Sequence, residues 1–112
     1  MAHPEIIKTA QAYINQIPKE WGLKKSYLFG SYAHGHPNKD SDIDIAVVLD
    51  NQNDFYVNQM LLMRLRRNID LRIEPHPIYE KDFTSDNPFA YEIQRTGIVL
   101  HSFENAVLNV EY

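Results

Sequence analysis

Apolar side chains recur near helical spacing in three parts of the chain. The first helix is predicted from Pro4 to about Lys19, and the second from Phe55 to Arg67 after the polar break at 50–54. A third is predicted from Pro88 to about Thr96, because Asn87 is a suitable N-cap and proline suits the first helical turn. The residues expected to be buried are Ile6, Ile7, Ala10, Tyr13, Ile14 and Ile17 in the first helix and Val57, Met60, Leu61 and Leu65 in the second.

Between these helices, short apolar runs predict four strands, at 24–29, 42–49, 68–73 and 98–101. In the second strand, alternation places Asp42 and Asp44 on one face, with Ile43, Ile45 and Val47 directed into the core. The third run alternates in the same way, and Pro75 and Pro77 are expected to end it. The pattern predicts an α/β (α+β) fold: one domain over residues 1–112, with a small mixed sheet and helices packed mainly on one face.

Composition narrows the class of protein. The chain has 112 residues, no cysteine and a formal net charge of −4. Without cysteine, disulfides and thiolate zinc sites are excluded. No apolar run approaches membrane-spanning length and no signal-peptide pattern precedes the first helix, so we expect a cytoplasmic protein without membrane contact. The negative charge argues against nucleic acid as a direct partner, because nucleic-acid binding normally needs a basic face.

The candidate chemistry lies between residues 30 and 49. Asp42 and Asp44 would repel each other on one strand face unless a cation neutralises them, and Mg²⁺ prefers carboxylate oxygens and also accepts phosphates. The Gly30-Ser31 turn supplies a complementary feature, since glycine allows close backbone approach and a serine hydroxyl can bind phosphate oxygens. A phosphate-binding turn beside a carboxylate pair indicates nucleotidyl transfer.

Gly30-Ser31, followed after ten residues by Asp42-x-Asp44, resembles the signature of the nucleotidyltransferase fold shared with DNA polymerase β. Gly35 and Ser41 match this signature as well. The short chain is similar to the minimal nucleotidyltransferases (MNT), which are often the antitoxin partners of HEPN ribonuclease toxins. The resemblance covers residues 26–100, and its two short motifs are specific only in combination.

The resemblance implies an enzyme that transfers AMP from ATP to an acceptor hydroxyl, a tyrosine of a HEPN-type toxin, and so acts as an antitoxin. It implies nucleotide binding by Gly30, Ser31 and Ser41. It also implies catalysis and metal binding by Asp42, Asp44 and Asp70, with two Mg²⁺ ions, or Mn²⁺ as a possible substitute. Homo- or hetero-oligomers are both compatible with this function.

Several alternatives remain open from the sequence. Glu74 is the reserve for the third carboxylate, and Asp70 could instead form a structural ion pair with Arg72. His34 stands where the family often has arginine, and His34 and His36 could join His76 in a transition-metal site or be merely solvated.

Two other functions also fit the sequence. The chain could be a non-catalytic antitoxin that acts by contact alone. It could also be a nucleotidyltransferase acting on a small molecule or on RNA, although such enzymes usually carry a further substrate-binding domain.

Overall fold

A four-stranded mixed sheet forms the centre of the molecule. The computed structural model describes residues 4–35, 37 and 41–102. The strands are β1 (Leu23–Phe29), β2 (Ile43–Leu49), β3 (Ile73–Tyr79) and β4 (Ile98–Ser102), and they lie in the order β3-β2-β1-β4. Strand β1 runs antiparallel to β2 and β4, whereas β2 and β3 are parallel. The mixed sheet confirms the expected fold class.

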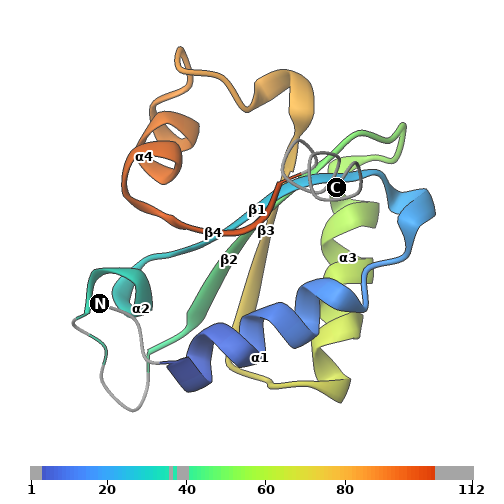
Figure 1. Ribbon diagram of the computed structural model, residues 1–112. Helices are drawn as coiled ribbons and strands as arrows, with labels where there is room; N and C mark the ends of the chain where they lie inside the picture. Colours follow the sequence, from blue (N-terminus) through green and yellow to red (C-terminus); the bar gives the residue numbers. More distant parts are fainter. Residues whose placement is uncertain (1–3, 36, 38–40, 103–112) are drawn as a thin grey trace, which may run out of the picture.

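The helices cover the two faces of the sheet unequally. They are α1 (Pro4–Asn15), the single turn α2 (Ser31–His34), α3 (Phe55–Leu65) and α4 (Pro88–Thr96). Three short 3₁₀ turns accompany them: η1 (Lys19–Trp21), η2 (Arg66–Asn68) and η3 (Glu80–Asp82). Helices α1 and α3 lie on one side of the sheet, and α4 packs on the other (Figure 1). No helix within the described ranges combines the length and apolar character needed to cross a bilayer.

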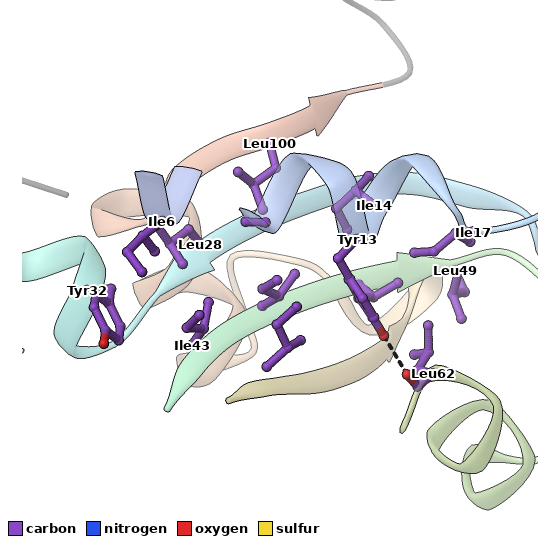
Figure 2. Packing of buried hydrophobic residues seen from close by; sticks show 14 residues of the cluster. Ile6, Tyr13, Ile14, Ile17, Leu28, Tyr32, Ile43, Leu49, Leu62 and Leu100 are labelled. Atoms are coloured by element: carbon purple, nitrogen blue, oxygen red, sulfur yellow. Dashed lines mark hydrogen bonds between the residues drawn. The ribbon is translucent and has the colours of Figure 1, made fainter. Parts of the chain in front are cut away.

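The main core lies between α1, α3 and the sheet (Figure 2). Ile43, Ile45 and Val47 are fully buried there, as the alternation of β2 predicts. The predicted face of the first helix is also correct: Ile6, Ala10, Tyr13, Ile14 and Ile17 are buried and Ile7 is partly buried. The Tyr13 hydroxyl crosses this core and donates a hydrogen bond of 2.7 Å to the Leu62 carbonyl oxygen, which ties α1 to α3.

The predicted buried face of α3 is only partly correct: Leu61 is partly buried and Leu65 packs against the main core, but the other two predicted residues do not. Val57 and Met60 are exposed, whereas Asn58 and Leu62 are buried. The Asn58 side chain forms amide hydrogen bonds with Asn51 and Asn53 in the preceding loop. These bonds fix the rotation of the helix about its axis, and Leu62, four residues later, therefore faces the core.

The third strand also differs from the prediction. Residues 66–68 extend α3 as a 3₁₀ turn, and β3 begins only at Ile73 and continues through Pro75 and Pro77. Two prolines are tolerated because β3 is an edge strand, where an absent N–H on the outer side breaks no ladder hydrogen bond. The outer edge is covered from α3 and η2: Gln59 Nε2 donates to the Pro75 carbonyl, and Arg66 Nη1 donates to the Ile73 carbonyl.

Candidate functional site

Two aspartates mark one end of β2, on the face of the sheet opposite α1 and α3. Asp42 is exposed and immediately precedes the strand, while Asp44 lies on it and is half-buried. The register places Asp44 between Phe29 of β1 and Glu74 of β3. Because α4 packs around Ala46 and Val48 further along β2, the carboxylate end of this face stays accessible.

The Gly30-Ser31 turn lies directly against Asp44. Gly30 has φ 76° and ψ −154°, a backbone conformation that is essentially restricted to glycine. A Cβ atom added there would also collide with the Asp44 carboxylate. Gly30 therefore allows the turn and the aspartate to occupy adjacent space, and the exposed Ser31 opens α2 beside them. Ser41, the other predicted nucleotide-binding residue, is half-buried and precedes Asp42.

Glu74 is the third carboxylate of this group. Its pKa is raised, chiefly by a hydrogen bond with the Asp42 side chain, then by burial, and further by the negative charges of Asp42 and Asp44. A raised pKa means that the three carboxylates resist full ionisation together. A cation would relieve this repulsion, so the donor set fits the divalent metal that the sequence implies.

His76 lies two residues after Glu74 and therefore on the same face of β3. Its Nε2 atom is 3.1 Å from Asp44 Oδ1. The ring is held edge-on by Phe29, with ring centroids 4.9 Å apart, and lies 6.3 Å from Phe89. Asp44, Glu74 and His76 each offer one ligand atom, and these atoms lie within 4.8 Å of one another.

Asp70 has a different environment. It lies in the turn before β3, where its carboxylate accepts from the Arg72 backbone N–H at 2.9 Å and from Arg72 Nη2 at 2.8 Å. The Arg72 guanidinium, which also donates to the Tyr32 hydroxyl, holds the pKa of Asp70 below its usual range. Asp70 is not part of the group that gathers ligand atoms around Asp44 in the described residues.

From the sequence, Glu74 is only the reserve for the third carboxylate, and His76 is only part of an alternative transition-metal site. Their joint position could have been found from the i, i+2 spacing, had the strand been placed over 73–79. His34 is exposed on α2 and is not in the ligand group found among the described residues, which favours the alternative of a solvated side chain over a metal site shared with His76. His36 lies outside the described residues.

A groove of about 390 Å³ adjoins His76. Its walls come from the edge of β3, the start of α3 and the start of α4: Phe55, Gln59, His76, Pro77, Ile78, Tyr79, Asp82, Asn87 and Phe89. A second hollow of about 400 Å³ lies at the opposite ends of β2 and β3, lined by residues 49–53 and 79–81. Of these two hollows, only the first is lined by a residue of the ligand group, His76, so we associate the first with the chemistry of the site.

Comparison with known proteins gives matches over most of the chain. Residues 11–105 match the family described as polymerase beta, nucleotidyltransferase. A Methanocaldococcus jannaschii protein assigned as a protein adenylyltransferase is 31% identical over 78 residues, which are 66% of this chain and 78% of that protein. The protein adenylyltransferase MntA of Shewanella oneidensis is 43% identical over 61 residues, or 51% of this chain, and the match spans only 42% of MntA.

Solved structures share the fold. One similar chain belongs to the complex of tri-AMPylated Shewanella oneidensis HEPN toxin with MNT antitoxin. The TM-score is 0.57 at 19% sequence identity, and the superposition covers 89% of this chain and 76% of that one. At this identity the likeness establishes a common fold.

Proposed function

Because this chain belongs to the polymerase beta nucleotidyltransferase family, we propose that it transfers AMP from ATP to a hydroxyl group of a partner protein. The acceptor is a tyrosine of a HEPN-type toxin, which the modification silences, so the chain acts as an antitoxin. The names of both curated relatives describe protein adenylyltransferases, and the similar solved complex contains an AMPylated HEPN toxin.

One observation carries this proposal: the glycine-serine turn and three carboxylates meet at the open end of one sheet face. In the proposed site, Gly30, Ser31 and Ser41 bind the nucleotide, with the Ser31 hydroxyl and adjacent backbone N–H groups holding phosphate oxygens. Asp42 and Asp44 bind Mg²⁺, with two ions in the complete site. The bound metal would neutralise triphosphate charge and stabilise the departing pyrophosphate.

We assign the third carboxylate role to Glu74 in preference to Asp70. Glu74 pairs with Asp44 in the sheet and its side chain reaches Asp42, whereas Asp70 is engaged by Arg72. The acceptor oxygen forms a bond to the α-phosphorus as the bond to pyrophosphate breaks, and a nearby carboxylate accepts the hydroxyl proton.

In this proposed function, residues 1–112 form one minimal nucleotidyltransferase domain that works in the cytoplasm, the compartment that supplies ATP. Hetero-oligomers with the toxin follow from the proposed reaction.

The test is the double variant Asp42→Asn/Asp44→Asn, incubated with ATP, Mg²⁺ and a HEPN-type protein from the same locus. The parent should add about 329 Da per transferred AMP, the mass expected of nucleotidyl transfer, as measured by mass spectrometry. The double variant should add none, because neutral amides are poor ligands for a hard cation. The matched control is Asp50→Asn/Asp86→Asn, which removes two exposed carboxylates elsewhere and should retain transfer.

The same variant distinguishes an enzyme from a contact-only antitoxin. It should fold at least as stably as the parent in metal-free buffer, because it removes repulsion between like charges. Protection of cells from the toxin by this inactive variant would show that catalysis is dispensable. Transfer of AMP to RNA or to a small molecule in place of the toxin would favour those substrates.

A further inference from the structure

His76 has no assigned role in the reaction, although it lies inside the carboxylate group. Its side chain is about as sheltered as that of Asp44, with 30% and 25% of their surfaces exposed. Phe29 contacts the imidazole ring from β1, and Phe89 approaches it from α4. The imidazole ring is carried by β3 and is held in place by side chains from β1 and α4, with its Nε2 atom directed at Asp44.

The distances suit coordination of one ion by these side chains. Octahedral ions with metal–oxygen bonds of about 2.1 Å hold neighbouring ligand atoms roughly 3 Å apart. Asp44 Oδ1 and His76 Nε2 are 3.1 Å apart, and the Glu74 ligand atom lies within 4.8 Å of both. Only a modest closure of Glu74 would complete the set of three donors.

We propose that Asp44, Glu74 and His76 form a mixed carboxylate–imidazole metal site that selects Mn²⁺ over Mg²⁺. Asp44 would also bind the Mg²⁺ ion held by Asp42, so the two metal positions are adjacent and this site is the second of them.

The selectivity follows from the nitrogen donor. Mg²⁺ binds oxygen ligands and gives up its waters reluctantly, so an imidazole adds little to its affinity. First-row transition ions accept imidazole readily, and Mn²⁺ also accepts carboxylates. A site with two carboxylates and one imidazole therefore favours Mn²⁺ over Mg²⁺ more strongly than a site of carboxylates alone does.

This inference deepens the proposed function and concerns the same face, but its test needs neither nucleotide nor toxin. Metal-free full-length protein is titrated with Mn²⁺ or Mg²⁺ in a calorimeter. The Mn²⁺-loaded protein is then studied by pulsed electron paramagnetic resonance, which detects a coordinating ¹⁴N nucleus. His76→Gln removes the donor, and His101→Gln is the matched control, because His101 lies on β4 and is outside the ligand group.

The parent and His101→Gln should show nitrogen coupling to Mn²⁺. His76→Gln should lose that coupling and bind Mn²⁺ about tenfold more weakly, while its affinity for Mg²⁺ stays nearly constant. If His76 had only a structural role, its replacement would weaken the binding of Mn²⁺ and of Mg²⁺ to the same extent. Absence of nitrogen coupling in the parent, or its persistence in His76→Gln, would overturn the proposal. The parent spectrum decides the matter even if the variant folds poorly.

The metal test and the AMP-transfer test fail separately. If AMP is transferred but Mn²⁺ has no nitrogen ligand, the proposed enzymatic function is supported and the imidazole site is refuted. If Mn²⁺ has a nitrogen ligand but AMP is transferred to no acceptor, the imidazole site is supported and the proposed enzymatic function is refuted.

Discussion

The choice between Glu74 and Asp70 as the third carboxylate gives the sharpest prediction. Glu74→Gln keeps the volume of the side chain but removes one of three neighbouring charges. Metal coordination contributes several kcal/mol to charge stabilisation in such reactions, so losing a carboxylate ligand should cost about 3 kcal/mol, or roughly a hundredfold in rate. Asp70→Asn instead breaks an ion pair whose Arg72 side chain is 45% exposed, and such pairs contribute at most about 1 kcal/mol to stability.

The two variants should therefore separate activity from stability. Glu74→Gln should lose most AMP transfer in a single-turnover assay with saturating ATP and Mg²⁺. In metal-free buffer it should be at least as stable as the parent. The raised pKa of Glu74 means that folding favours its protonated form, so ionisation at higher pH costs stability that glutamine does not lose. Asp70→Asn should keep its activity and be slightly destabilised. Full transfer by Glu74→Gln together with loss in Asp70→Asn would return the role to Asp70.

Three further predictions concern the frame of the site. Gly30→Ala should lower stability by roughly 1–3 kcal/mol, because the backbone conformation of Gly30 suits only glycine. It should also lower metal affinity, because the new methyl group displaces the Asp44 carboxylate. Unchanged Mn²⁺ affinity in calorimetry would contradict this prediction. Tyr13→Phe removes a buried hydrogen bond and should cost about 1 kcal/mol, a fall of about 4 °C in melting temperature; an unchanged melting temperature would contradict the assigned bond. Arg72 lowers the pKa of Asp70, so the pair should stabilise the fold above about pH 4 and lose this effect as pH falls further. Urea titrations of parent and Asp70→Asn should therefore differ at pH 7, and the difference should shrink progressively as pH falls below about 4; a difference that widens in acid would refute the assignment.

Local patterns determined much of this protein. The sequence alone located β2, because a period-two alternation of Asp42 and Asp44 with three branched apolar residues has one consistent orientation in a sheet. It located α4 in the same way, since the Asn87 side chain accepts from the N–H groups of Phe89 and Ala90 as the capping rule requires. The Gly30-Ser31 turn also followed from residue chemistry, because few other residues tolerate that backbone conformation.

Tertiary structure decided the remainder. The prolines at 75 and 77 indicated the end of a strand, but the tertiary structure makes β3 an edge strand, where proline costs no ladder hydrogen bond. That shift moved Asp70 into a turn and brought Glu74 and His76 next to Asp44. Residues 44 and 76 are far apart in sequence, and only the parallel pairing of β2 with β3 brings them together. The alternation of residues along one strand shows which of them share a face. The identity of the neighbouring strand and its register depend on the packing of the whole sheet.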